Sequence, residues 1–345
     1  MTIHVGIRGL GRIGRNVFRL LYAREDIRIA AVSEIAEPAA LEYLLRFDSV
    51  LGRFPDEISV REGNLYVLGR QIPLLSEADG RQTAWGDLGV HTVIEATSRT
   101  RTRAELARHL DAGAKRVLSL APPDPADPPD RVAIPGVTDE ALSAADRVVS
   151  NASSTVHCVA PVLKILHEAF GIRRGFFTTV HSYTSQQRLA DVPSEDKRRG
   201  RAAAENIIPQ ASRSPAMLDR ALPELAGRIT GSAMSVPVVE GSLVDLVCWH
   251  EKPVKPVAIN EVIRTAAASR RWSRALRFEH EPIVSKDVAK TPFSSVFDSL
   301  ATMAMRDRVS KTVSWFDSGY GYAHRAIELV ERYAELDAAA GGAAS

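Results

Sequence analysis

Short apolar runs and longer amphipathic stretches alternate along the first part of the chain. Ile3–Ile7 and Ile29–Val32 are short apolar runs, and a helical pattern that ends at Leu21 separates them. A third run of the same character, Val93–Ser98, follows later. Because buried parallel strands are short and apolar and their connections are helical, this part of the chain predicts an α/β domain.

The pattern becomes richer in strands in the second half of the chain. Three strand-like segments are Phe176–Val180, Ile229–Val236 and Leu243–Trp249, and a final helix is predicted over Tyr322–Leu336. The residues after that helix are small and polar, so a flexible tail is expected there. The expected organisation is a first domain over 1–153, a second over 154–318, a C-terminal helix over 319–337 and a flexible tail over 338–345.

Composition sets limits on the class of protein. A chain of 345 residues with 45% hydrophobic and 25% charged residues is long enough for two globular domains. The formal net charge of +2 gives no reason to expect nucleic acid or membrane as a partner. Without a signal-peptide pattern or a long apolar span, a cytoplasmic protein is expected. Cys158 and Cys248 both lie in apolar surroundings, so buried thiols are expected rather than a disulfide.

A glycine-rich turn follows the first predicted strand. Gly9, Gly11 and Gly14 have the spacing G-x-G-x-x-G between a strand and a helix, which favours a dinucleotide whose pyrophosphate rests on the helix N-terminus. Glu34 ends the second strand, where a carboxylate accepts hydrogen bonds from the ribose hydroxyls and repels the extra phosphate of NADP. The sequence therefore predicts an NAD site. The residues expected to line its phosphate-binding turn are Gly9, Leu10, Gly11, Arg12, Ile13 and Gly14.

A second motif, Ser150-Asn151-Ala152-Ser153-Ser154-Thr155-Val156-His157-Cys158, joins a predicted strand end to a predicted helix over Val159–Phe170. It resembles the motif Ser-Asn-Ala-Ser-Cys-Thr-Thr-Asn-Cys of the phosphorylating aldehyde dehydrogenases, the family of glyceraldehyde-3-phosphate and erythrose-4-phosphate dehydrogenases. The resemblance extends over nearly the whole chain. Further motifs that carry it are Gly11–Arg15, Gly113–Val117, Thr179–His181, Arg201–Ala203, Asn206–Pro209, Val244–Leu246, Ser314–Asp317 and Gly321–Tyr322. Glu34–Ala36 and Leu44–Ser49 look most like the erythrose-4-phosphate branch.

The resemblance implies a fold and an assembly. The expected fold class is α/β, with a Rossmann NAD-binding domain and an α+β domain built on a mixed, mostly antiparallel sheet. The C-terminal helix is expected to pack back on the first domain. A homotetramer, or a heterotetramer with a paralog, is expected, because Ser182–Arg201 resembles the loop that lies across a neighbouring subunit's cofactor site.

The resemblance also implies a reaction, and one residue departs from it. In the family a cysteine thiolate adds to an aldehyde, hydride passes to NAD, and phosphate releases the resulting thioester as an acyl phosphate. Ser154 stands at the position of that cysteine, while His181 matches the histidine that acts as acid and base. Serine has no thiolate-like form at neutral pH, so this route should be crippled. Cys158 matches the family's second, buried cysteine, so it is not expected to replace the nucleophile.

Other predicted site residues follow from matched positions. Ser235 stands where the family has an arginine that holds the substrate phosphate, and Ser318 and Glu240 each stand where it has an asparagine. Arg99, Arg101 and Arg103 are expected to be a solvated helix start, with a new anion-binding patch as the alternative. Further cofactor-binding residues are expected at Thr97, Ser98, Ser318 and Tyr322. Residues expected at the substrate or anion site are Ser153, Thr155, Thr184, Ser212, Arg213 and Ser235, and no metal site is expected.

Three functions remain open at this point. The first is a pseudoenzyme of the family that binds NAD and regulates or assembles with an active paralog. The second is an NAD-dependent oxidoreductase with an altered substrate, a small phosphorylated aldehyde or a related metabolite, that uses His181 as acid and base. The third is a hydrolase that pairs Ser154 with His181. The first two differ in aldehyde-dependent NADH formation, and the third predicts ester turnover that is lost in Ser154→Ala.

Overall fold

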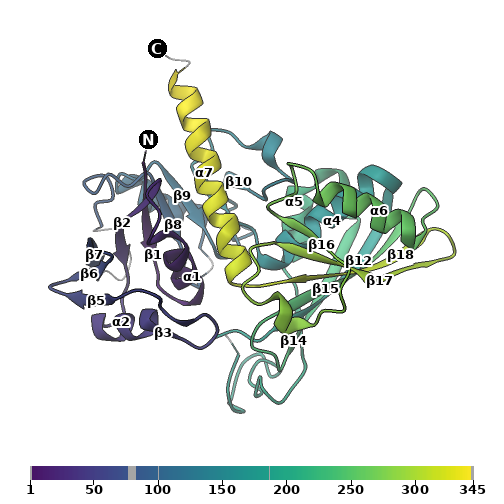
Figure 1. Cartoon of the computed structure of the whole chain (residues 1–345), viewed down its shortest axis with the longest axis horizontal. Helices are drawn as coiled ribbons and strands as arrows, with labels where there is room; N and C mark the ends of the chain where they lie inside the picture. The colour runs from purple at the N-terminus through teal and green to yellow at the C-terminus, as the bar shows by residue number, and fades with distance from the viewer. Residues whose placement is uncertain (1, 77–82, 100, 186, 343–345) are drawn as a thin grey trace. The chain divides into compact units, whose positions relative to one another are not determined.

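A computed structural model describes residues 2–76, 83–99, 101–185 and 187–342. The chain divides into two compact units. The first unit contains residues 1–133, 139–152 and 323–345, and the second contains residues 134–138 and 153–322. The predicted α/β fold class is confirmed, because the first unit has a mostly parallel sheet with helices and the second a mixed sheet with helices (Figure 1).

The sheet of the first unit has the strand order β10-β11-β9-β8-β1-β2-β7-β6-β5. The strands from β10 to β7 are parallel, and β7, β6 and β5 form an antiparallel edge. Its strands are β1 (Ile3–Arg8), β2 (Ile27–Ser33), β5 (Ile58–Arg61), β6 (Asn64–Val67), β7 (Arg70–Leu75), β8 (Thr92–Glu95), β9 (Arg116–Ser119), β10 (Arg131–Val132) and β11 (Val148–Ser150), with a separate hairpin of β3 (Phe47–Asp48) and β4 (Gly52–Arg53).

The helices of the first unit bury apolar faces that are spaced at helical periods. Val17, Phe18 and Leu21 are the buried apolar residues of α1 (Arg12–Leu21), and the unit also contains α2 (Pro38–Arg46) and α3 (Arg103–Asp111). A capping box at Thr102 and Glu105 fixes the start of α3, since each side chain accepts from the other residue's backbone N–H.

The last helix, α7 (Tyr320–Gly342), ends later in the chain than predicted. Residues 338–342 are helical, whereas the tail was expected to begin at residue 338. The three alanines at 338–340 are the best helix formers, and the carboxylate of Asp337 is held by Arg116 Nη1 at 2.8 Å and His91 Nε2 at 2.8 Å. These contacts continue the helix past the predicted end at residue 337. Residues 343–345 of the predicted tail lie outside the described residues.

The sheet of the second unit has the order β13-β14-β12-β15-β18-β17-β16. Two of its six neighbouring pairs are parallel and four are antiparallel, so the predicted mixed, mostly antiparallel sheet is confirmed. Its strands are β12 (Ile172–Ser182), β13 (Ile208–Ala211), β14 (Ile229–Val236), β15 (Ser242–His250), β16 (Leu276–Glu279), β17 (Ser295–Met305) and β18 (Val309–Phe316).

Three helices contact the second sheet and lie on one face of it in Figure 1. They are α4 (Ser154–Phe170), α5 (Ser214–Ala221) and α6 (Pro256–Ala267). Buried and less buried residues alternate along β15 and β18, as expected for strands with one face against helices. The longest of these helices, α4, begins at Ser154, five residues before the predicted Val159, and this places the second motif at a helix N-terminus.

Candidate functional site

The glycine-rich turn lies at the carboxyl end of β1, between the neighbouring strands β2 and β8. Chain order reverses here, since β2 lies on one side of β1 and β8 on the other, and such switch points bind ligands in open α/β sheets. Gly9 has a φ of +91°, a conformation that favours glycine and gives the tight turn. A Cβ added at Gly11 would meet no atom within 4 Å, so open space remains where a pyrophosphate would approach.

Glu34 joins the end of β2 to this turn. Its carboxylate accepts hydrogen bonds from the backbone N–H of Leu10 at 2.5 Å and of Ile35 at 2.7 Å. These contacts fix the acid beside the turn, where it was predicted to hold ribose hydroxyls. The side chain of Arg8, the nearby cation that could attract an extra phosphate, is buried and lies 3.5 Å from the carboxylate of Glu95 and 3.1 Å from Ser33 Oγ. The residues of the turn therefore fit an NAD pyrophosphate and ribose.

A buried carboxylate that the sequence analysis did not identify organises the end of β8. Glu95 is fully buried and accepts from Thr97 N–H at 3.1 Å and from the Thr97 hydroxyl, with His109 Nε2 at 3.2 Å and Arg101 Nε at 3.6 Å. Burial raises the pKa of this carboxyl, but hydrogen bonds from His109 and Thr97 and the charge of Arg101 outweigh it, so the pKa lies below its usual value. The network places Thr97 against Gly9 and leaves Ser98 exposed.

Ion pairs occupy two of the three arginines that formed the alternative anion patch. Arg101 lies beside Glu95. Arg103, the first residue of α3, has its Nε 2.7 Å from the carboxylate of Asp130. Arg99 is exposed. Because paired guanidinium groups attract a further anion weakly, these contacts argue against a new anion-binding patch, although Arg101 is largely buried rather than solvated.

The second motif forms a strained turn before α4. Ala152 has a φ of +51°, a left-handed conformation that costs a non-glycine residue about 1 kcal/mol or more. Asn151 is fully buried, and its backbone N–H donates to the Ser119 carbonyl at 2.9 Å. Ser153 is the N-cap, whose Oγ accepts from Val156 N–H at 3.3 Å. Ser154 is therefore the first residue of a 17-residue helix, where the helix dipole stabilises negative charge.

Neither cysteine of the chain lies at this helix start. Cys158 is one turn further along α4, fully buried, with its Sγ 3.6 Å from the Ser314 carbonyl oxygen. Cys248 is fully buried in β15. Burial raises the pKa of both thiols to about 12, so neither forms a thiolate at neutral pH. The predicted buried, unpaired thiols are confirmed.

His181 lies near the end of β12, with its ring edge-on to Phe316 at 5.8 Å between centroids. Its Nδ1 lies 2.6 Å from the Ser182 carbonyl oxygen, which places the proton on Nδ1 and leaves Nε2 as the acceptor of the neutral ring. Within the described residues no hydrogen bond joins Ser154 to His181, and the backbone carbonyl of Ser182 is one group that orients the imidazole. The arrangement therefore suits a general base better than a Ser-His-acid triad.

The predicted anion-site residues divide among three places in the second unit. Ser153 and Thr155 lie at the start of α4, and Ser212 and Arg213 form the turn between β13 and α5, where Ser212 Oγ accepts from Ser214 N–H at 3.2 Å. Thr184 and Ser235 are linked through Gln187, a residue that the sequence analysis did not identify. No periodicity or spacing marks this glutamine, because its role depends on a neighbouring strand.

Two buried carboxyl groups surround the backbone of Ser318. Glu240 Oε1 accepts from both the N–H and the hydroxyl of Ser318 at 3.2 Å. Asp317 accepts from the backbone N–H groups of Lys290 at 2.7 Å and Gly319 at 2.8 Å. Burial and the nearby Glu240 carboxylate raise the pKa of Asp317 to about 6, although its backbone hydrogen bonds oppose this. Tyr322, the last predicted cofactor residue, lies edge-on to His157 at 5.7 Å.

Replacing Glu240 with glutamine is expected to stabilise the protein above about pH 6 and to leave it unchanged near pH 4. The pKa of Asp317 in the folded protein lies above its ordinary value, so the folded state holds more protons between about pH 4 and 6, and stability falls as pH rises through that range. Glu240→Gln keeps the oxygen that accepts from Ser318 and removes the repulsion between the two carboxylates. The free energy of unfolding should rise by about 1 kcal/mol. Urea unfolding at both pH values measures the difference. Glu281→Gln, an exposed change in the same unit, is the control, and parallel pH profiles for Glu240→Gln and the unmodified protein would contradict the pairing.

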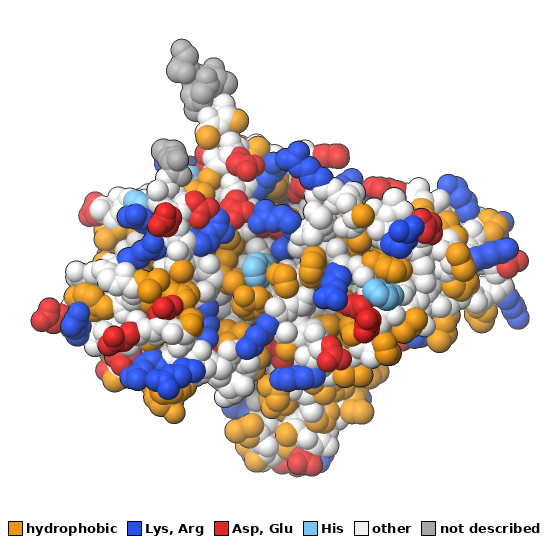
Figure 2. Space-filling model, viewed as in Figure 1, with side chains coloured by type: hydrophobic (Ala, Val, Ile, Leu, Met, Phe, Trp, Pro, Cys, Tyr) orange, Lys and Arg blue, Asp and Glu red, His pale blue; other side chains and the backbone are white. Residues whose placement is uncertain are grey.

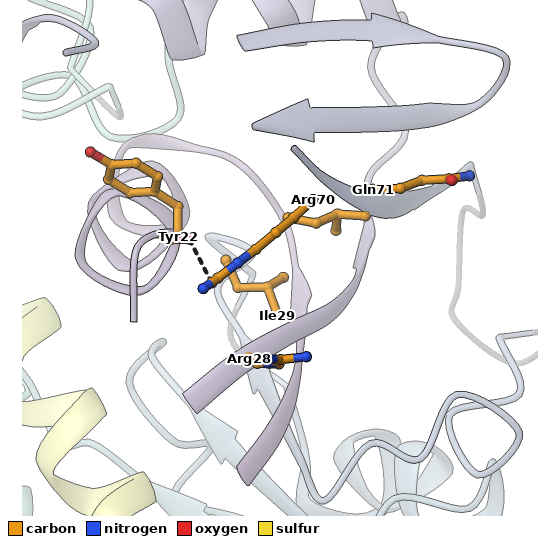
Figure 3. A pocket seen from close by; sticks show the side chains of 6 residues that line it. Tyr22, Arg28, Ile29, Arg70 and Gln71 are labelled. Atoms are coloured by element: carbon orange, nitrogen blue, oxygen red, sulfur yellow. Dashed lines mark hydrogen bonds between the residues drawn. The ribbon is translucent and has the colours of Figure 1, made fainter. Parts of the chain in front are cut away.

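A cavity of about 270 Å³ lies in the first unit, away from these residues, and is lined by Tyr22, Arg28, Ile29, Arg70, Gln71 and Ile72 (Figure 3). Arg70 crosses it and donates to the carbonyl oxygens of Tyr22 at 3.0 Å and Arg24 at 2.7 Å. Because Ile29 lies in the first half of β2 and Tyr22 follows α1, this cavity is at the opposite end of the strands from the glycine-rich turn.

Two negative findings hold for the described residues. None of the helices there is both long and apolar enough to span a membrane. Across the same residues, His, Cys, Asp and Glu side chains do not gather in groups of three or more that could hold a metal ion.

Two family models match the chain. Residues 3–103 match the model described as glyceraldehyde 3-phosphate dehydrogenase, NAD binding domain, and residues 153–318 match its C-terminal domain. Among similar proteins, the glyceraldehyde-3-phosphate dehydrogenase of Geobacillus stearothermophilus is 44% identical over 330 residues, which are 95% of this chain and 97% of that protein. Those of Streptomyces coelicolor and Mycobacterium avium are 42% and 41% identical, over 95% and 96% of this chain and 98% of each relative.

Proposed function

The chain belongs to the glyceraldehyde-3-phosphate dehydrogenase family and has NAD as its cofactor, and on that premise we propose that it is a member without the phosphorylating thioester reaction. One observation carries the proposal: the chain has two cysteines, both are fully buried, and burial raises both pKa values to about 12. A thioester requires an accessible thiolate beside the bound aldehyde. Ser154 occupies the favourable position at the start of α4 but supplies a hydroxyl.

In this proposal NAD is held by the chain's glycine-rich turn and Glu34, and bound NAD would supply a hydride acceptor. The open space at Gly11 and the fixed carboxylate of Glu34 support that placement. Because Arg8 is paired with Glu95, little positive charge is left to offset Glu34, and a preference for NAD over NADP is expected. The protein would then have a regulatory role, in which it binds NAD and associates with other subunits, including those of a catalytically active paralog. Both proteins would be in the cytoplasm.

Calorimetry and a spectrophotometric assay on one preparation test this proposal. We expect NAD to bind and NADH formation from glyceraldehyde 3-phosphate or erythrose 4-phosphate with inorganic phosphate to stay below about 0.01 s⁻¹, far under the 1–10³ s⁻¹ typical of enzymes. The resemblance to the erythrose-4-phosphate branch remains our prediction. Turnover of either sugar phosphate at an ordinary enzymatic rate would refute the proposal.

A second candidate function is an NAD-dependent oxidoreductase with an altered substrate. The orientation of His181 favours it, because the Ser182 carbonyl fixes the proton on Nδ1 and Nε2 can act as a base. The Ser154–His181 hydrolase has less support, since Ser154 and His181 share no hydrogen bond in the part of the chain that the structure describes. NADH formation with unphosphorylated aldehydes would separate this candidate from the pseudoenzyme.

We also propose that the protein is a homotetramer or forms mixed tetramers with a paralog. Phe176, Leu300, Met303 and Met305 are exposed on strands of the second sheet. Leu189, 85% exposed, lies in the loop between β12 and β13, and Figure 2 shows hydrophobic side chains on the segment that projects below β14 in Figure 1. Exposed apolar side chains on this scale favour burial by another subunit. Light scattering that reports a monomer across micromolar concentrations would contradict the assembly.

A further inference from the structure

Ser235 is the buried centre of a small group of uncharged polar side chains. It lies near the end of β14, where it is paired with His181 of β12 on one side and with Ile208 of β13 on the other. Only 3% of its surface is exposed. The strand register therefore places this hydroxyl beside the histidine that acts as base in the second candidate function.

Two glutamine amides converge on this hydroxyl. Gln187 Nε2 donates to Ser235 Oγ at 3.3 Å, and Gln210 Nε2 donates to the same oxygen. The amide oxygen of Gln187 accepts from the N–H and the hydroxyl of Thr184 at 2.6 and 2.8 Å. We call Thr184, Gln187, Gln210 and Ser235 the Ser235 cluster.

The cluster has one donor and one acceptor left for a ligand. Ser235 Oγ already accepts two hydrogen bonds, so its own hydrogen remains to be donated, and among the described residues no acceptor for it is present. Likewise the amide oxygen of Gln210 has no donor among the described residues, and this side chain is half-buried. A donor next to an acceptor matches a hydroxyl group, which accepts one hydrogen bond and donates another without carrying charge.

Charge distinguishes this arrangement from an anion site. None of the four side chains is ionisable in the physiological range, and a phosphate dianion moved into a buried neutral site loses hydration without a compensating cation. Arg213, three residues after Gln210, is exposed at the start of α5, where water screens its charge. A serine hydroxyl also cannot reproduce the two parallel hydrogen bonds of a guanidinium group to phosphate.

We propose that the Ser235 cluster is a binding site for the hydroxyl-bearing end of a small, uncharged sugar aldehyde, such as an unphosphorylated triose or tetrose. The ligand's hydroxyl group accepts from Ser235 Oγ–H and donates to the Gln210 amide oxygen, beside His181. The inference rests on the proposed function, because it takes the region next to His181 as the substrate site, and it names the substrate class of the second candidate.

Ligand titrations followed by NMR on the NAD-saturated protein test the site. D-glyceraldehyde and D-erythrose are expected to bind more tightly than inorganic phosphate or glyceraldehyde 3-phosphate. Ser235→Ala and Gln210→Met each remove one hydrogen-bonding partner and should weaken aldehyde binding about three- to tenfold. Ser232→Ala removes a hydroxyl from the same strand outside the cluster and should change nothing. Ser235→Arg should reverse the preference in favour of the phosphorylated ligands.

Thermal unfolding of each variant establishes that the folded protein is being titrated. Gln210 is half-buried, so Gln210→Met keeps the test decisive if Ser235→Ala does not fold. Tighter binding of phosphate than of D-glyceraldehyde, or equal aldehyde affinity in Gln210→Met and the unmodified protein, would overturn the inference. In that case NAD binding without sugar-phosphate turnover would still stand for the proposed function. Conversely, phosphorylating turnover would refute the proposed function, while the aldehyde titrations would still decide the ligand class.

Discussion

A cysteine at position 154 is expected to react rapidly with iodoacetamide and yet to restore little turnover of glyceraldehyde 3-phosphate. Ser154 is the first residue of α4, and the N-terminal end of a 17-residue helix lowers the pKa of a thiol placed there. The two natural thiols are fully buried with pKa values of about 12, so labelling of Ser154→Cys should occur at the new position alone.

Turnover should remain at least about a hundredfold below an ordinary member of the family, because a nucleophile is only one requirement of the reaction. The uncharged Ser235 cluster contains no clamp for a substrate phosphate, and Ser318 is bonded to the buried Glu240 carboxylate. Losses that act on binding, orientation and nucleophilic attack combine, so restoring one leaves the others. Adding Ser235→Arg and Ser318→Asn to Ser154→Cys should raise the rate further.

Mass spectrometry of the alkylated protein and the NADH assay measure the two halves of this prediction. The unmodified protein is the control for labelling, and it should stay unlabelled under conditions that label Ser154→Cys completely. Cys158→Ala in the Ser154→Cys background should leave labelling intact. A turnover number near 1 s⁻¹ for the single variant, within the range of about 1–10³ s⁻¹ for enzymes, would show that the missing thiol is the whole defect.

Local patterns predicted the parts of the fold that depend on neighbours in sequence. The glycine spacing between Gly9 and Gly14 and the apolar run before it gave a strand, a turn and a helix in the right order, as β1 and α1 show. The second motif was placed correctly at a strand end, but the start of α4 was missed by five residues. Thr155, Val156 and His157 have low helix propensity, whereas all three are buried, so tertiary packing rather than propensity decides that turn.

Long-range pairs could not be predicted from pattern. Glu240 and Ser318 are 78 residues apart in sequence, and Gln210 and Ser235 are 25 apart on strands whose pairing has to be known first. Resemblance identified Ser235 and Glu240 as departures from the family. Only the structure shows that the amides of Gln187 and Gln210 surround Ser235 and that the Asp317 carboxyl lies near Glu240. Side chains that act through partners on other elements leave no periodic signal, and this applies equally to Glu95 on β8 and His109 on α3.

Alanine substitutions three residues apart in the glycine-rich turn are expected to separate folding from cofactor binding. A Cβ added at Gly14 would lie 1.9 Å from the Gly9 carbonyl oxygen, a backbone atom that can move only with the turn itself. Gly14→Ala should therefore lower the free energy of unfolding by about 3 kcal/mol or more, through overpacking of α1 against the end of β1. NAD affinity should fall with it, since the displaced backbone forms the phosphate-binding turn.

Gly11→Ala is the matched variant, and it should lose NAD affinity while keeping most of its stability. Gly11 has a φ of −61° and a ψ of −171°, which any residue adopts, and its added Cβ meets no atom within 4 Å. Stability should fall by no more than about 1 kcal/mol, the cost of a poorer N-cap residue. NAD affinity should still drop about tenfold or more, because the methyl group fills the space through which the pyrophosphate approaches the backbone. Urea unfolding without cofactor and calorimetry with NAD measure the two effects, and unchanged NAD affinity in Gly11→Ala would mean that the pyrophosphate does not lie on this turn.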